Sequence, residues 1–305
     1  MPARLSIHPV NGPVSVHRVE DGGDCVLGRG AEADVQVIDD RVSRRHARIS
    51  HRPGEGWRVE DLGSKNGLYV DDTRVDASAL PAAAELSLGG VPVRFEPLAD
   101  AAARADAERE LDRHRDGARL QRRLDPAVGL RELLDRLLAS VMQVVGADRG
   151  FLLLTHPDGD LRLARLSGLA EEDLAGEEFG GSLSVARQAM AERQPVICYD
   201  ASSDTRLSDR PSVQSAGIRL LACLPLVVLD RVAGVVYADS REPGRELTEL
   251  DVEILEGLAS HAALALAVAG LQDEVEGLEG ALGRAGEAGG SLRRLTAARE
   301  LLEIP

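Results

Sequence analysis

Apolar and polar residues alternate in short runs through the first third of the chain. Trp57 and Val59 alternate with charged residues, and Val93 and Phe95 lie in a similar run further along. Gly, Asp and Pro residues separate the runs. Because successive side chains of a β-strand point to opposite faces, this pattern with its frequent turn residues predicts an all-β sandwich over residues 1–98.

The pattern changes after the predicted sandwich. Residues 99–125 are rich in Ala, Arg, Asp and Glu, a composition that favours an exposed helix used as a linker. Asp125-Pro126 is then a typical helix start, and apolar residues recur at helical spacing as far as Gly146. Strand-like and helical segments alternate from there onwards, which predicts an α+β domain over residues 126–270.

Two elements near the end of this domain are distinctive. The runs LLACLPLVVL and VAGVVYAD flank a tight connection at Asp230 and are expected to pair as strands. A long helix is expected to begin near Thr248, with Asp251 in the capping position, and to run towards Gly286.

An apolar seam follows the second half of that long helix. Its members alternate spacings of four and three, as the a and d positions of a coiled coil do: Leu264, Val268, Leu271, Val275, Leu278, Leu282 and Ala285. The pattern predicts a C-terminal coiled coil with a helical tail over residues 271–305, and a homodimer. The alternative is a single helix that packs on the sheet of its own domain.

Charge and composition exclude several classes of function. The formal net charge is −15, and aromatic residues make up only 2% of the chain, so direct nucleic-acid binding is not expected. The only Lys is Lys65, within GSKNG, which excludes a Walker A phosphate loop. No apolar run approaches the roughly 20 residues of a membrane span. The N-terminus lacks a secretory signal, so we expect a cytoplasmic protein with no membrane partner.

The cysteines limit the chemistry further. Cys25, Cys198 and Cys223 lie far apart, without a Cys-x-x-Cys pair or a neighbouring His, which argues against disulfides and against a metal site. Cys198 and Cys223 fall in apolar, strand-like runs, where a free Cys is usually an inert core residue. We therefore expect no catalytic residues, no metal and no enzymatic activity.

Three short motifs in the first domain suit the recognition of a phosphate group. They are Gly28-Arg29, the segment Ser43-Arg44-Arg45-His46, and Asn66-Gly67. A phosphothreonine carries nearly two negative charges, which Arg29 can meet with a rigid fork of donors while Ser43 adds a hydroxyl. Asn66 has a donor and an acceptor that suit the main chain of an extended peptide. Taken alone, an Asn-Gly pair is most often a hairpin turn.

Together these motifs resemble the pattern of the forkhead-associated (FHA) family, which is GR, then S-x-x-H, then NG. The stretches VLGRGAEADVQVIDDRVSRRHARI and WRVEDLGSKNGLYVDD match it in order and in spacing, within a resemblance that covers about residues 5–98. The resemblance implies a β-sandwich that binds phosphothreonine in a partner protein. The chain departs from the family at Lys65, where many members carry Thr or Ser.

The FHA resemblance also implies roles for individual residues. The phosphopeptide-binding residues would be Arg29 and Ser43 at the phosphate, Arg45 beside them, and Asn66 at the peptide backbone. The structural residues at the site would be Gly28, His46 and Gly67, with His46 bracing the loops rather than contacting the ligand.

Residues 126–270 resemble the GAF family of small-molecule sensor and dimerisation domains. The likeness includes SLSVARQAMAERQPVICYD, the two paired runs given above, and LTELDVEILEGLASHAALALAVA. It implies a central antiparallel sheet flanked by helices, with a pocket on one sheet face. The identity of any ligand stays unknown, and the Lys of the family's cyclic-nucleotide motif is missing.

We therefore expect a multidomain, cytoplasmic signalling module without catalytic activity. Its partner would be a Thr-phosphorylated protein, such as a Ser/Thr kinase or its substrate. One alternative is an enzyme, a GAF-type methionine-sulfoxide reductase that uses Cys198 and Cys223. The other is the regulatory fragment of an enhancer-binding transcription activator whose effector domains would follow Pro305.

Overall fold

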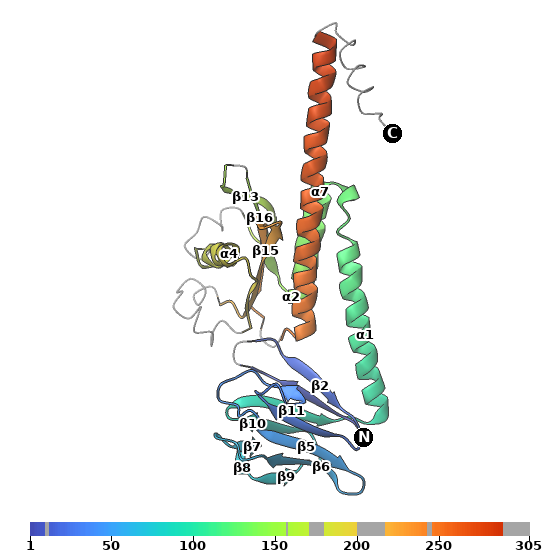
Figure 1. The fold of residues 1–305 in the computed structure, drawn as a ribbon, viewed down its shortest axis with the longest axis vertical. Helices are drawn as coiled ribbons and strands as arrows, with labels where there is room; N and C mark the ends of the chain where they lie inside the picture. The colour runs from blue at the N-terminus through green and yellow to red at the C-terminus, as the bar shows by residue number, and fades with distance from the viewer. Residues whose placement is uncertain (10–11, 157, 171–179, 200–216, 243–245, 289–305) are drawn as a thin grey trace, which may run out of the picture.

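The computed structural model describes residues 1–9, 12–156, 158–170, 180–199, 217–242 and 246–288. A β-rich part lies at one end of an elongated molecule, and an α+β part lies beside a long helix that extends beyond it (Figure 1). The predicted order of an all-β domain followed by an α+β domain is confirmed.

Two β-sheets form the first domain. The first sheet has the strand order β2 (Ser15–Val19), β1 (Ala3–Ile7), β11 (Val91–Pro97), β10 (Ala84–Leu88), β7 (Leu68–Val70) and β8 (Thr73–Val75). The second has the order β4 (Val35–Gln36), β3 (Asp24–Gly28), β5 (Ala47–Arg52), β6 (Gly56–Asp61) and β9 (Ala77–Ala79).

The predicted alternation of buried and exposed residues is present in both sheets. In β6 Trp57 and Val59 are buried between exposed neighbours, and in β11 Val93 and Phe95 are buried likewise. Trp57 meets Phe95 edge to face, with ring centroids 5.6 Å apart, and this contact joins the two sheets. The two inner faces therefore share one core.

A helix, α1 (Asp100–Arg122), follows the sandwich as the composition predicts. Its packing differs from that of a free linker. Arg4 on β1 forms an ion pair with Asp106 (2.7 Å), which ties the helix to the sandwich. At Gly117 a Cβ atom would lie 2.6 Å from Ile254 of α7 (Glu249–Ala288), so the missing side chain lets the two helices approach closely. The linker helix is thus fixed at both ends.

The second domain has a five-stranded antiparallel sheet. Its order is β13 (Leu161–Ser167), β12 (Arg149–Thr155), β16 (Arg231–Ser240), β15 (Leu220–Val228) and β14 (Val196–Cys198). The expected pairing of β15 with β16 is confirmed, and their tight turn holds Leu229 and Asp230 at positive φ, 43° and 64°.

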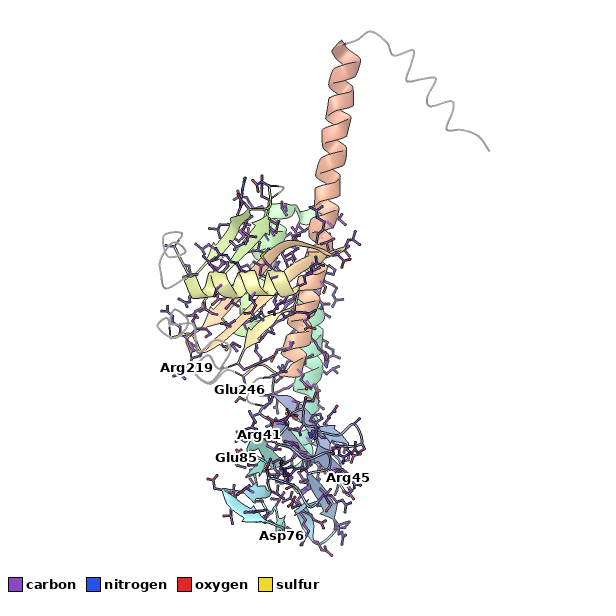
Figure 2. The ribbon with its side chains drawn as sticks, turned by 60° about the vertical axis from the view of Figure 1, so that its left-hand side comes forward. Arg41, Arg45, Asp76, Glu85, Arg219 and Glu246 are labelled. Carbon is purple, nitrogen blue, oxygen red and sulfur yellow. The ribbon has the colours of Figure 1, made fainter. Side chains whose placement is uncertain are left out.

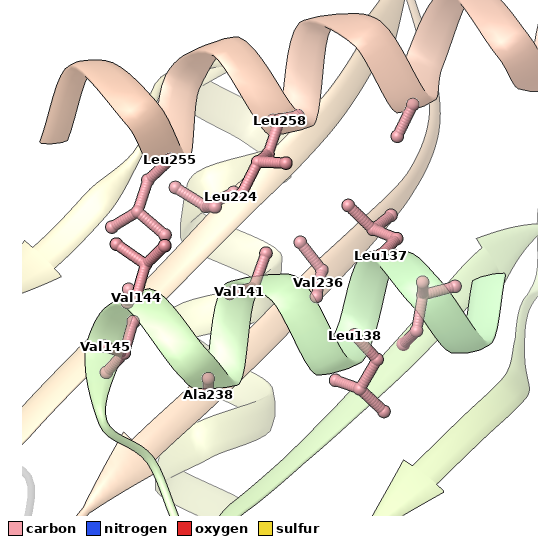
Figure 3. Packing of buried hydrophobic residues seen from close by; sticks show 14 of the residues in the cluster. Leu137, Leu138, Val141, Val144, Val145, Leu224, Val236, Ala238, Leu255 and Leu258 are labelled. Atoms are coloured by element: carbon pink, nitrogen blue, oxygen red, sulfur yellow. The ribbon is translucent and has the colours of Figure 1, made fainter. Parts of the chain in front are cut away.

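Helices cover both faces of this sheet. Helix α2 (Leu130–Val145) and the first half of α7 pack on one face, where Leu137, Val141 and Val144 approach Leu255 and Leu258 (Figure 3). Helix α4 (Gly180–Glu192) lies on the other face (Figure 1).

The helix expected to start at Asp125-Pro126 begins later. The Asp125 carboxylate accepts the Ala127 N–H (2.9 Å) and caps only a short 3₁₀ turn, η1 (Pro126–Val128). Gly129, at φ 87°, then changes the direction of the chain before α2 begins at Leu130. The predicted start of this helix at Asp125-Pro126 is therefore wrong, because the Asp-Pro pair begins a separate 3₁₀ turn.

Helix α7 begins as the sequence predicts. The Thr248 N–H donates to the Asp251 carboxylate (2.9 Å), and the Asp251 N–H points back to the Thr248 hydroxyl (3.4 Å), which completes a capping box. Arg113 of α1 adds a hydrogen bond to the same carboxylate (2.7 Å).

The sandwich also contributes to the start of α7. The carbonyl of Val14, in the β1–β2 loop, accepts the Glu249 N–H (3.2 Å), and the Val14 N–H donates to Leu247 (2.9 Å). One of the N–H groups that a helix leaves unpaired in its first turn is therefore satisfied by the other domain.

The stretch Glu249–Ala269 is long and apolar enough to cross a membrane by length and composition, whereas no run of that length was expected from the sequence. Leu255, Leu258 and Ala262 of this stretch are buried against the sheet, as in a core helix. Helix α7 continues to Ala288, and the rest of the predicted tail lies outside the described residues.

We predict that Asp251→Ala lowers the free energy of unfolding by about 1–3 kcal/mol, because it removes the capping box and leaves Arg113 without its carboxylate. Thermal unfolding of the intact chain measures this loss. Glu253→Ala is the matched control, since Glu253 is exposed in the same helical turn. Equal unfolding temperatures for the two variants would contradict the role given to Asp251.

Candidate phosphopeptide-binding site

The loop after β3 packs directly against the segment before β5. A Cβ atom at Gly28 would lie 2.1 Å from the carbonyl oxygen of Arg44, so only glycine fits this position. The Arg29 N–H donates to the Ser43 carbonyl (3.0 Å), and the Gly30 N–H donates to the Arg44 carbonyl (3.1 Å). These backbone bonds place Arg29 beside Ser43.

His46 joins this segment to the turn at Asn66-Gly67. Its side chain is fully buried, Nδ1 accepts the Ser43 N–H (3.1 Å), and Nε2 lies 3.1 Å from the Gly67 carbonyl oxygen. Because a carbonyl only accepts, the ring is the tautomer with its proton on Nε2. Burial lowers the pKa of His46, which favours this neutral form. The position is the one that a bracing role requires.

Ser43 and Asn66 lie next to each other through further bonds. The Ser43 hydroxyl oxygen accepts the N–H of Lys65 (3.0 Å), and the Asn66 side-chain amide donates to the Arg41 carbonyl (2.7 Å). Gly67 adopts φ 83° and donates its N–H to the Ser64 hydroxyl (3.0 Å). The structure thus brings the three predicted motifs together at one end of the sandwich.

The site contains two arginines whose charges have no partner among the described residues. Within the part of the chain that the structure describes, the exposed guanidinium groups of Arg29 and Arg45 have no hydrogen-bonded or ion-paired partner. The side chains of Arg45 and Arg41 are both labelled on the sandwich in Figure 2. Exposed guanidinium groups without a partner suit a doubly charged phosphate.

Asp39, Arg41 and Arg74 also lie at this site, although none of the three predicted motifs includes them. The Asp39 carboxylate accepts two bonds from the Arg41 guanidinium (2.9 and 2.8 Å), which lower the pKa of Asp39. The Asp-x-Arg spacing is the one sequence signal for this pair. Arg74 reaches Gly67 from β8, and no spacing in the sequence indicates that contact.

The second domain offers no reactive cysteine. Cys198 and Cys223 are both fully buried in one apolar cluster, and burial raises the pKa of the Cys223 thiol. Cys25 in the sandwich is also buried, with its pKa raised to about 11. Thiols in such surroundings are poor nucleophiles. Among the described residues, no group of three or more His, Cys, Asp and Glu could hold a metal.

The face of the sheet under α4 is one of the two faces on which the expected ligand pocket could lie. There Phe151 and Tyr237 are fully buried and stack with their ring centroids 4.7 Å apart. Val185 and Ala189 of α4 pack in the same cluster. In the described residues, this part of the face is filled by the protein's own side chains.

We predict that the sandwich loses stability as the pH falls below about 6.5, because the unfolded chain takes up a proton there that buried His46 resists. His46→Gln should lower the free energy of unfolding at neutral pH by about 1–3 kcal/mol and should reduce this pH dependence. Urea unfolding between about pH 7.5 and about pH 5.5 measures both effects.

Part of the pH dependence should remain in that variant, because burial also lowers the pKa of His17. His114→Gln, at an exposed position on α1, is the matched control and should behave like the unsubstituted chain. A His46→Gln variant with the pH dependence of this control would refute the assignment.

Comparison with known proteins finds two families in this chain. Residues 25–89 match the family model of the FHA domain, and residues 127–267 match that of the GAF domain. The chain is 38% identical over 88 residues to the FHA domain-containing protein FhaB of Mycolicibacterium smegmatis, an alignment that covers 28% of this chain and 56% of that protein.

Two further likenesses concern the same region. The glycogen accumulation regulator GarA of M. smegmatis is 40% identical over 62 residues, which cover 20% of this chain and 39% of GarA. The crystal structure of the FHA domain of the CT664 protein from Chlamydia trachomatis is 26% identical, with a TM-score of 0.31, and the match covers 32% of this chain and 100% of that domain. The chain spans about half the length of FhaB and less of GarA. It carries an FHA domain followed by a GAF domain, the families to which these two parts belong.

Proposed function

We propose that this chain is a signalling module whose FHA domain binds a phosphothreonine segment of a partner protein. Arg29 and Ser43 would hold the phosphate, Arg45 would add charge, and Asn66 would hold the peptide backbone. The observation that carries the proposal is that the Arg29 backbone is hydrogen-bonded to the Ser43 carbonyl, while the Arg29 guanidinium has no partner among the described residues. The planar fork of an arginine loses less entropy for each hydrogen bond formed than a flexible ammonium group does.

The partner is a Thr-phosphorylated protein, such as a Ser/Thr kinase or its substrate. The chemistry of the site supports a phosphate dianion as the ligand of the arginines, and the FHA resemblance implies that a threonine carries it. The module would act in cytoplasmic kinase signalling or in the regulation of transcription. We place the FHA domain at residues 1–98, the linker at 99–125, the GAF domain at 126–270 and the helical tail at 271–305.

The rival function, a sulfoxide reductase, finds no support in the second domain. A reductase needs an accessible thiolate, whereas Cys198 and Cys223 are buried thiols. We therefore assign the GAF domain a role in ligand sensing or dimerisation and not in catalysis.

Arg29→Ala should weaken phosphopeptide binding by about 10- to 100-fold, because it removes charged hydrogen bonds of about 1.5–3 kcal/mol. Titration calorimetry on the intact chain with a phosphothreonine peptide and its dephosphorylated form measures this effect. Arg58→Ala, an exposed arginine on β6, is the matched control and should bind normally. The proposal fails when the unsubstituted chain binds both peptides equally well.

The start of the free half of α7 supports a dimer. Leu264 is 61% exposed, and the adjoining Leu266, Ala267 and Val268 are only partly buried. Leu264 and Val268 are the first two members of the apolar seam found in the sequence, and the helix that carries them continues to Ala288. A second copy of the helix would remove this seam from water, at on the order of 1.5–3 kcal/mol for each buried Leu or Val.

We expect the intact chain to be a dimer at tens of micromolar and Leu271→Asp/Leu278→Asp to be a monomer, because a charge at an a or d position opposes pairing. Light scattering distinguishes the two states. Glu256→Asp, at an exposed position of α7, is the control and should remain dimeric. A monomeric intact chain would exclude the coiled coil.

A further inference from the structure

Arg74 lies against the turn that carries Asn66. It belongs to β8, opposite Tyr69 of β7, and its guanidinium extends back to Gly67. A Cβ atom at Gly67 would lie 2.9 Å from Nε and 3.3 Å from Cζ of Arg74. The absence of a side chain at Gly67 therefore makes room for the Arg74 guanidinium at the residue that follows Asn66.

The charge of Arg74 is unmatched. Arg74 is exposed, and no carboxylate of the described residues lies within 4.0 Å of it, although Asp72 and Asp76 are close in sequence. Arg41, whose carbonyl accepts the Asn66 amide, differs, because its guanidinium is ion-paired with Asp39 through two of its five donors. Of the two arginines at this turn, Arg74 is the one whose charge is not neutralised by a carboxylate of the described residues.

A peptide backbone held by Asn66 would pass over this turn. Its flanking side chains would then come within reach of a planar guanidinium that binds carboxylates and phosphates through two parallel bonds. The phosphothreonine itself is assigned to Arg29 and Ser43, which lie on the Lys65 side of the turn. Arg74 instead reaches the turn at Gly67 from β8. Arg74 is thus placed to meet a different anionic group of the same ligand.

We propose that Arg74 is a second anion-binding residue of this site and recognises an acidic group that flanks the phosphothreonine. The group is a carboxylate or a second phosphate, since both present paired oxygens to a guanidinium. The inference rests on the proposed phosphopeptide function. It adds a preference for acidic or multiply phosphorylated segments.

The test uses the intact chain and short peptides with a central phosphothreonine. One peptide has neutral flanks, a set carries a single Asp at successive flanking positions, and a parallel set carries a second phosphothreonine there. At one position the unsubstituted chain should bind the acidic peptide about 3- to 10-fold more tightly than the neutral one. Comparison of the two sets shows whether carboxylate or phosphate is preferred.

Arg74→Gln should abolish this gain and leave binding of the neutral peptide unchanged. Arg74→Lys should retain part of the gain, because it keeps the charge but not the fork. Arg58→Gln, at an exposed position on β6, should keep the whole gain. The lysine variant keeps both the positive charge and a long side chain against Gly67, so it separates the effect of the charge from the effect of losing the side chain.

Two results would overturn the inference while the proposed function stands. The unsubstituted chain could bind phosphopeptides without any gain from a flanking acidic group, or Arg74→Gln could weaken neutral and acidic peptides equally. Equal binding of phosphorylated and dephosphorylated peptides would overturn both the inference and the function on which it rests.

Discussion

The buried imidazole of His46 is the interaction on which the ligand-facing end of the sandwich depends. One nitrogen holds the N–H of Ser43, and the other holds the carbonyl of Gly67. The two loops come from distant parts of the sequence, and neither contains regular secondary structure that could fix it. Because a buried polar group without a partner is costly, the ring permits only loop arrangements that satisfy both nitrogens. The spacing of Ser43 and Asn66 follows from this requirement.

A second constraint joins the two domains at the start of α7. The first turn of this helix is completed by the Asp251 carboxylate from within and by the Val14 carbonyl from the sandwich. Arg113 of α1 binds the same carboxylate. The sandwich, α1 and α7 thus meet at the start of α7. The helix that carries the apolar seam is therefore attached directly to the FHA domain and not only through the linker.

Local patterns predicted the elements well, and contacts between elements poorly. The alternation around Trp57, the β15–β16 turn at Asp230 and the capping box at Asp251 are short-range features that neighbouring residues determine. The packing of α1 on α7 depends on Gly117 meeting Ile254, far away in the sequence, and no periodicity indicates it. At the site, the three motifs could be identified from the sequence by their residue types and order. The contact of Arg74 with Gly67 arises only when the β7–β8 hairpin folds back.

The polar groups of the site divide into those already used and those still available. The Ser43 oxygen accepts the Lys65 N–H, so this backbone N–H is no longer free for a phosphate, whereas the Ser43 hydroxyl hydrogen has no acceptor among the described residues. One N–H of the Asn66 side-chain amide donates to the Arg41 carbonyl, which leaves the second N–H and the amide oxygen for a peptide backbone. In the proposed function, the ligand supplies phosphate oxygens to Ser43 and Arg29 and a backbone donor to Asn66. A phosphorylated peptide has both, whereas a free phosphate ion lacks the backbone donor.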